Sequence, residues 1–130
     1  MSVSVSIVTG PLLPRPAMNT IDGAGALVVF EGIVRAREGD REIDALHYET
    51  YEPMAQRMLG AIGEDLLSRH ALLRLAVEHS RGTVGVGECS FRLTVASAHR
   101  KEALAAVDEF IDRMKREVPI WKSAPGVRPA

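Results

Sequence analysis

The sequence is poor in cysteine and has no long apolar run, and each scarcity excludes a class of protein. Cys89 is the only cysteine, which excludes an intrachain disulfide and a cysteine-rich metal site. No stretch approaches the roughly 20 apolar residues of a membrane span, and no basic segment followed by an apolar run marks a signal peptide. These features favour a soluble protein in the reducing cytoplasm.

A dominant charge is also lacking. The 16 basic and 17 acidic residues are interspersed and give a formal net charge of −1, so no global field favours nucleic acid or a membrane surface. His47, His70 and His79 lie without ligand spacing, and we expect neither a metal site nor a bound cofactor. Any anion must therefore be recognised by a local site.

Apolar residues are plentiful enough for one core. Hydrophobic residues make up 46% of the 130 positions, a size and composition typical of a single domain. We find no internal repeat and no linker. The sequence predicts one domain over residues 1–130, with a mobile tail at 123–130 because that end is rich in Pro and Gly.

The first half of the sequence carries three strand patterns. Residues 3–7 alternate valine or isoleucine with serine, which predicts a short, half-buried strand. Residues 26–35 are apolar and β-branched, with Gly32 as a candidate bulge, and residues 42–51 form another strand pattern after a charged loop. We predict that these last two strands pair as a hairpin.

Two helices and a second hairpin complete the pattern. Apolar residues at helical spacing predict an amphipathic helix over residues 53–70, with Pro53 in the first helical position. Residues 73–78 and 88–97 are predicted to form strands joined by a glycine-rich turn. A last helix is predicted before Pro119, which ends it. Its apolar stripe consists of Leu104, Val107, Ile111, Met114 and Val118.

Hairpins separated by helices, rather than strands that alternate strictly with helices, indicate the fold class. They predict an α+β domain in which two main helices pack on one face of a mainly antiparallel sheet. Such a fold by itself says nothing of function.

The start of the last helix is the first candidate site. Ser97 is a good N-cap, which would place His99 and Arg100 in the first helical turn. Free backbone N–H groups and the helix dipole favour an anion there, and a cation at this position suits an anionic ligand. The alternative is a packing histidine beside a solvated arginine.

Two lysines near the end of the same helix form the second candidate site. Lys115 falls beside the apolar stripe, so its ammonium group would emerge at the edge of the core. Lys122 follows a Pro-Ile-Trp segment, read as a rigid turn, that could hold a second ammonium group nearby. The alternative, which is more common for lysines in general, is that both are simply solvated.

Arg35 and Arg37 follow the long strand and could bind a phosphate or carboxylate, although loop arginines are usually solvated. The glycine-rich turn at Gly82 lacks the context of a phosphate-binding loop, so we interpret it as part of a hairpin. Cys89 lies in a strand pattern, and nothing in the sequence marks it as an activated nucleophile.

Taken together, these segments resemble the MoaE family, the catalytic subunits of molybdopterin synthase. Four collinear pieces between residues 25 and 122 carry the resemblance. They are Gly25-Ala26 through Phe30-Glu31-Gly32-Ile33-Val34-Arg35; Leu46-His47-Tyr48-Glu49 with Tyr51 and Met54; Ser97-Ala98-His99-Arg100; and Met114-Lys115 with Pro119-Ile120-Trp121-Lys122. The resemblance implies the hammerhead-type α/β fold of that family, with residues 1–24 as a variable N-terminal part.

The resemblance also implies a function. The family transfers sulfur from the thiocarboxylated Gly-Gly C-terminus of a small ubiquitin-like subunit to cyclic pyranopterin monophosphate, which forms the dithiolene of molybdenum cofactor. It implies a homodimer that binds two small subunits as a heterotetramer. The implied catalytic residues are Lys115 and Lys122. The implied substrate-binding residues are Ile33, Val34, Arg35, His99, Arg100, Lys115, Lys122, Ser123 and Ala124, with His99 and Arg100 supplied by the neighbouring chain.

Two positions depart from the family pattern. Ser80 stands where an arginine usually follows the histidine, and Ala124 stands where a glutamate is usual. The sequence also lacks a longer C-terminal tail that many members carry. Two other functions therefore stay open: a small-ligand binding or regulatory module, and a divergent relative that keeps the partner interface without turnover.

Overall fold

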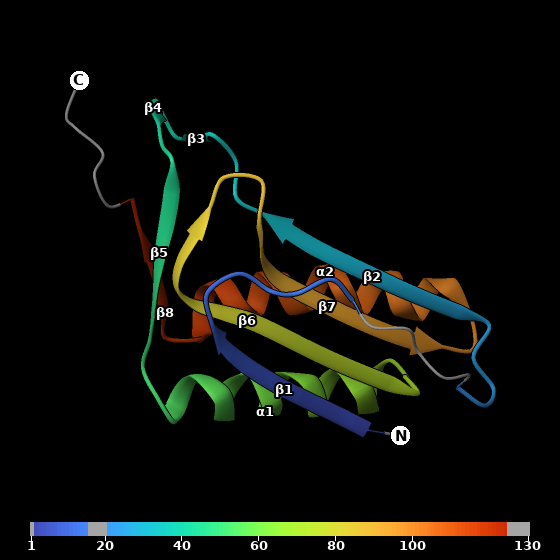
Figure 1. The fold of residues 1–130 in the computed structure, drawn as a ribbon. Helices are drawn as coiled ribbons and strands as arrows, with labels where there is room; N and C mark the ends of the chain where they lie inside the picture. Colours follow the sequence, from blue (N-terminus) through green and yellow to red (C-terminus); the bar gives the residue numbers. More distant parts are fainter. Residues whose placement is uncertain (1, 16–20, 125–130) are drawn as a thin grey trace.

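A bent six-stranded sheet with two helices on one face forms the fold (Figure 1). The computed structural model describes residues 2–15 and 21–124. The elements are β1 (Ser2–Thr9), β2 (Ala26–Ile33), β3 (Arg37–Glu38), β4 (Arg41–Glu42), β5 (Ala45–Thr50), α1 (Met54–Arg69), β6 (Arg74–Gly85), β7 (Cys89–Ser97), α2 (Arg100–Glu117) and β8 (Ile120–Ser123). This architecture confirms the α+β prediction.

The long strand β6 organises the sheet. Along one edge it pairs with β7, which in turn pairs with β2. Along the other edge it pairs first with β1, in parallel, as far as Arg81, and then with β5, in an antiparallel sense, from Gly82. Gly82 has a φ of +81°, a conformation that favours glycine. Figure 1 shows the result: β5 and its neighbour β8 stand across the direction of the other strands.

The predicted hairpin between residues 26–35 and 42–51 is wrong. β2 pairs with β7, and β5 pairs with β6 and β8. The reason is the length of β6, which continues to Gly85 and so offers β5 a free edge. The charged segment between β2 and β5 pairs with itself as the small β3–β4 hairpin. The β6–β7 hairpin and the bulge at Gly32 are confirmed.

The core lies between the helices and the sheet. From α1, residues including Leu59, Ile62 and Leu66 are buried against the sheet. Gly63 allows the close approach of this helix to β1, because an added Cβ would lie only 2.9 Å from a methyl group of Val3. The helix begins at Met54 with Pro53 as its N-cap, one position earlier than predicted for this proline.

The buried side of α2 is shifted from the predicted stripe. Ala103, Ala106, Val107 and Phe110 are its buried residues, whereas Leu104 is 53% exposed. Small alanine side chains bring the helix close to the sheet, and Phe110 supplies the volume between them. The prediction used only large apolar residues and so placed Leu104, rather than Ala103, on the buried side of the helix.

Both ends of α2 are defined by local chemistry. The N-cap is His99 rather than Ser97, and the His99 backbone N–H donates to the carboxylate of Glu102, 3.2 Å away. At the other end the helix stops at Glu117, followed by an extended Val118, because the residue before a proline avoids the helical conformation. The predicted stop at Pro119 is confirmed.

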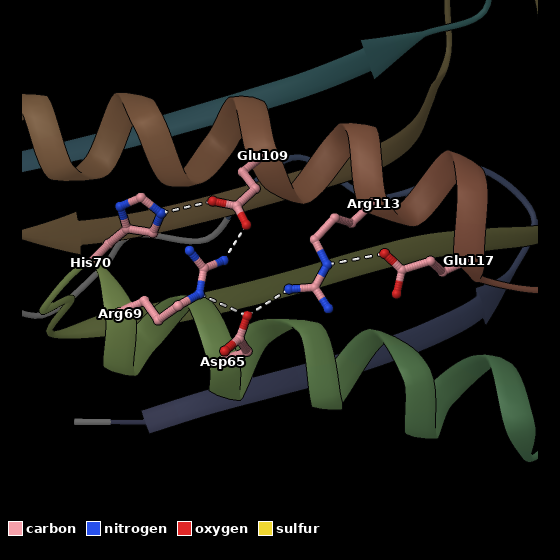
Figure 2. Close-up of polar contacts among 6 residues, drawn as sticks. All are labelled: Asp65, Arg69, His70, Glu109, Arg113 and Glu117. Atoms are coloured by element: carbon pink, nitrogen blue, oxygen red, sulfur yellow. Dashed lines mark hydrogen bonds and ion pairs between the residues drawn. The ribbon is translucent and has the colours of Figure 1, made fainter.

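An ion-pair network joins α1 to α2 on the outer side of the helix layer (Figure 2). Asp65 of α1 accepts hydrogen bonds from Arg69 (3.0 Å) and from Arg113 of α2 (2.6 Å). Glu109 of α2 accepts from Arg69 and lies 3.0 Å from the ring of His70. The Arg69 and Arg113 guanidinium groups hold the pKa of Asp65 below its usual range.

A buried arginine holds the opposite face of the sheet. Arg92 of β7 is 1% exposed and donates to Glu31 on β2 (2.9 Å) and Glu78 on β6 (3.1 Å). It also donates to the carbonyl oxygen of Leu13 (2.6 Å). The segment after β1 is thereby tied across β6 and β7, in agreement with its path in Figure 1.

Candidate active site

A cleft of about 620 Å³ opens where the end of α2 meets the end of β2 and the strands β5 and β8. Its inner surface is mainly aromatic and aliphatic, and its outer edge carries cations. The lining residues are Phe30, Glu31, Gly32, Ile33, Val34, Arg35, Glu38, Leu46, Tyr48, His79, Ser90, Phe91, Ile111, Met114, Lys115, Ile120, Trp121 and Lys122. A surface of this kind can accept a flat apolar ring that carries an anionic group.

Three exposed cations line this cleft: Arg35 in the segment after β2, Lys115 on α2 and Lys122 on β8. Lys122 Nζ lies 3.1 Å from the carboxylate of Glu38 in β3. The structure therefore brings together the second candidate site and one of the two candidate loop arginines. Arg37, the other, lies in β3 and faces Glu42 at 3.8 Å, outside the cleft lining.

Lys115 and Lys122 reach the same cleft because the chain reverses its direction between α2 and β8. The helix ends at Glu117, and the chain returns at once as β8, which pairs with β5 so that Lys122 lies opposite Tyr48. The predicted Pro-Ile-Trp turn is thus wrong in form, because Ile120–Ser123 is a strand. The predicted proximity of Lys115 to Lys122 is nevertheless supported, since both line one cleft.

The inner part of the cleft was not predicted from the sequence. The His79 ring lies 5.3 Å from the ring of Tyr48 in an edge-on arrangement and 5.8 Å from the ring of Phe91. The Tyr48 and Ser90 hydroxyl groups form a hydrogen bond of 2.9 Å. A signal was available: His79 continues the alternation of Leu75 and Val77 in β6, and a histidine in such a row faces the core.

His79 is 5% exposed, and its ring Nδ1 lies 2.7 Å from the carbonyl oxygen of Ser80. Burial lowers the pKa of His79 below its usual value, and the Ser80 carbonyl opposes this only in part. The ring is therefore neutral at physiological pH.

The other predicted binding residues lie in different places. Ile33 and Val34 line the cleft. Ser123 ends β8, and Ala124 packs against a small cluster that includes Val34; neither is among the lining residues. The predicted mobile tail lies outside the described residues from position 125 onward.

His99 and Arg100 are not brought to the cleft within this chain. Both are exposed at the start of α2, whereas Lys115 lies near its end. At 1.5 Å of rise per residue, the fifteen residues from Arg100 to Lys115 span about 22 Å. Any contribution of His99 and Arg100 to such a cleft must therefore come from another copy of the chain.

Cys89 and Ser80 each donate a hydrogen bond to a backbone carbonyl oxygen. Burial raises the pKa of the Cys89 thiol, which also donates to the carbonyl oxygen of Phe91 at 3.3 Å, so its reactive thiolate form is disfavoured. Ser80, one of the two positions noted above as departing from the expected pattern, is buried and donates to the carbonyl oxygen of Gly10 at 2.7 Å. Over residues 2–15 and 21–124, no three His, Cys, Asp or Glu side chains group as metal ligands, and no helix is long and apolar enough to span a membrane.

The model of the family described as "MoaE protein" matches residues 11–117. The chain belongs to the MoaE family. A relative named molybdopterin synthase catalytic subunit, from Oryza sativa subsp. indica, is 43% identical over 99 residues, which are 76% of this chain and 51% of the rice protein. This MoaE chain thus spans about half the length of that relative.

Solved structures agree with the MoaE assignment. Molybdopterin synthase from Staphylococcus aureus superposes with a TM-score of 0.82 at 30% identity, covering 95% of this chain and 93% of that one. A protein–protein complex of subunits 1 and 2 of molybdopterin-converting factor from Helicobacter pylori superposes with a TM-score of 0.73 at 27% identity, covering 92% and 83%. The MoaE fold therefore extends over nearly the whole of this chain.

Proposed function

We propose that this chain is the catalytic subunit of molybdopterin synthase and acts as a sulfurtransferase. It would transfer sulfur from the thiocarboxylated C-terminus of a small ubiquitin-like subunit to cyclic pyranopterin monophosphate, in the cytoplasm. The observation that carries this proposal is the convergence of Arg35, Lys115 and Lys122 on one cleft with an aromatic interior. Family membership supplies the reaction that such a cleft would perform.

The charges of the cleft suit both reactants. The substrate carries a cyclic phosphate, and the thiocarboxylate is itself an anion, so each gains from nearby guanidinium and ammonium groups. Phe30, Phe91 and Trp121 offer flat apolar surfaces to a pterin ring. A cleft with both features can bind the substrate and the partner's tail side by side.

Lys115 is the residue that we assign to the reacting atoms. It lies at the edge of the apolar interior, next to Met114 and without a carboxylate in ion-pair distance among the described residues. When the thiocarboxylate sulfur replaces an oxygen substituent on a pterin side-chain carbon, the carbon–oxygen bond breaks and a thioester results. Water must then attack the thioester carbonyl to release the carboxylate. An ammonium group beside that carbonyl would stabilise the oxyanion that develops. Lys122 would act as a second cation.

A second copy of the chain could complete the site. β2 pairs with β7 on one edge, and its other edge has no strand partner among the described residues. Leu27, Phe30 and Ile33 are exposed along β2, and an open apolar strand edge invites pairing with another strand. We therefore assign β2 as the contact between the two copies of a homodimer.

The relative directions of α2 and β2 would let each copy in such a dimer contribute residues to the cleft of the other. The backbone N–H of Gly25, just before β2, donates to Ser97 just before α2, so Arg100 lies at the first end of β2. α2 then runs in the same direction as β2, which brings Lys115 to the end at Ile33. Antiparallel pairing of two β2 strands around a two-fold axis would carry the partner chain's His99 and Arg100 toward this chain's cleft.

Reconstitution tests the proposed function. The chain is mixed with a thiocarboxylated small subunit and cyclic pyranopterin monophosphate, and the pterin is analysed by mass spectrometry for added sulfur. Light scattering during the titration measures assembly and should show a heterotetramer. Assembly without sulfur transfer would indicate a relative that keeps only the partner interface. Failure of both would favour the small-ligand binding module.

A further inference from the structure

The cleft contains one neutral nitrogen base among its charged groups. Its lining includes the cations Arg35, Lys115 and Lys122 and the carboxylates Glu31 and Glu38. Each carboxylate is already paired, since Glu31 accepts from Arg92 at 2.9 Å and Glu38 lies 3.1 Å from Lys122. His79 is the remaining lining residue whose side chain can accept a proton near neutral pH.

A hydrogen bond fixes the tautomer of His79. Because the Ser80 carbonyl oxygen only accepts, Nδ1 at 2.7 Å must carry the proton. In the neutral ring Nε2 is then the atom with the free lone pair. The ring is also held by its contacts with Tyr48 and Phe91, so the direction of that lone pair is fixed.

The His79 ring borders the cleft, since His79 is one of the lining residues. Its Nε2 makes no hydrogen bond to any described residue, whereas Nδ1 is hydrogen-bonded to Ser80. Because the residue as a whole is buried, the cleft is the side from which a water molecule can approach Nε2.

We propose that His79 is the proton acceptor of the reaction, with Nε2 taking a proton from the water molecule that hydrolyses the thioester. This inference rests on the proposed function. The water oxygen bonds to the thioester carbonyl carbon, the carbon–sulfur bond breaks, and its electron pair leaves with the pterin sulfur. The second proton of the water is lost to solvent from the new carboxyl group, so the partner's tail is released as a carboxylate. The proton passes from water to Nε2 and then to solvent, which restores the neutral ring.

The surroundings of His79 suit this role. Charged and titratable groups that line the cleft around it are Glu31 from β2, Arg35, Glu38, Tyr48 from β5, Lys115 from α2 and Lys122 from β8. Burial lowers the pKa of His79, and the hydrogen bond to the Ser80 carbonyl opposes this only in part. The ring is therefore in its accepting form at working pH, and it readily returns the proton to solvent.

The test compares His79→Gln with His70→Gln in single-turnover sulfur transfer by the complete complex. His70 is a matched control because it lies between α1 and α2 and pairs with Glu109, away from the cleft. We expect His79→Gln to lower kcat roughly a hundredfold, as for loss of one general base, with substrate affinity changed less than about twofold. The covalent thioester between pterin and partner tail should accumulate and be visible by mass spectrometry.

The pH profile separates this role from a structural one. In wild type, kcat should fall on acidification with an apparent pKa below the usual histidine value of 6.5, and this limb should vanish in His79→Gln but persist in His70→Gln. A wild-type profile without that limb overturns the inference even if the variant does not fold. Normal hydrolysis in a folded His79→Gln protein also overturns it. A protein that transfers no sulfur at all contradicts the proposed function instead.

Discussion

Lys122 and Glu38 face each other at 3.1 Å across the mouth of the cleft. This pair joins β8 to the small β3–β4 hairpin and leaves Lys122 partly neutralised. Lys115, on the neighbouring end of α2, has no such carboxylate among the described residues. The two lysines are therefore electrostatically unequal, and substitutions at each should have different effects.

Replacing Glu38 by Gln should strengthen binding of the anionic substrate. The carboxylate competes with that substrate for Lys122, and an exposed pair of this kind is worth at most about 1 kcal/mol, so the gain should be less than about fivefold. Calorimetry at low and high salt measures it, and the gain should shrink at high salt. Glu42→Gln is the control, because Glu42 faces Arg37 outside the cleft. Equal effects of both variants would contradict the assignment of Lys122.

Replacing Lys115 by Ala should leave fold and dimer intact, because the side chain is exposed and contributes little core area. Sulfur transfer should fall about a hundredfold or more, the usual contribution of one positioned acid, base or oxyanion donor. Arg116→Ala is the control on the next position of the helix, outside the cleft lining. Near-normal transfer in Lys115→Ala would move the catalytic assignment to Lys122.

Lys115→Arg distinguishes two roles for this lysine. Guanidinium keeps the positive charge but does not release its proton at working pH. Strong rescue relative to Lys115→Ala would indicate electrostatic stabilisation of the thioester oxyanion, and no rescue would indicate proton transfer or covalent chemistry. Single-turnover rates of the three proteins decide between them.

Mixed dimers should recover activity if each cleft uses two chains. In a dimer of Lys115→Ala with Arg100→Ala, one cleft carries both changes and the other carries neither. Random exchange would leave about a quarter of all clefts intact. Co-expression with two different tags, followed by single-turnover assays, measures this fraction. Activity no higher than that of the separate variants would contradict a shared site.

Unfolding experiments should report the buried state of His79. Its pKa is lowered in the folded chain, so below 6.5 the unfolded chain binds more protons than the folded chain. The free energy of unfolding should therefore be fully maintained above about pH 6.5 and fall as the pH is lowered from there. His79→Gln should show a smaller loss between pH 6.5 and 5 in urea titrations. Parallel curves for both proteins would show that His79 is not buried as a neutral ring.

Much of the fold was predictable because it depends on local patterns. Alternation in the strands and helical spacing around Leu59 and Val107 mark elements whose burial the structure confirms. Apart from the β6–β7 hairpin, strand partners were not predictable in the same way. The pairing of β5 depends on how far β6 extends beyond Glu78, and no residue in β5 itself carries that information.

The residues of the candidate site also differ in whether a local pattern reveals them. Lys115, Lys122 and Arg35 were found because charge beside an apolar pattern is visible in sequence, and the structure places all three around one cleft. His79 was set aside because a single histidine has no ligand spacing. Its role depends on the Ser80 carbonyl and on the aromatic rings around it, which only the folded chain brings into contact.

The length of α2 limits the kinds of mutation that this helix can tolerate. One rigid helix carries Arg100 at its start and Lys115 near its end, and in the proposed dimer these residues serve different clefts. Point substitutions along its exposed side leave both ends in place. Inserting one residue in the middle would turn one end by about 100° relative to the other and displace it by about 1.5 Å. Both clefts would then lose their alignment at once, so α2 should tolerate changes of residue far better than changes of length.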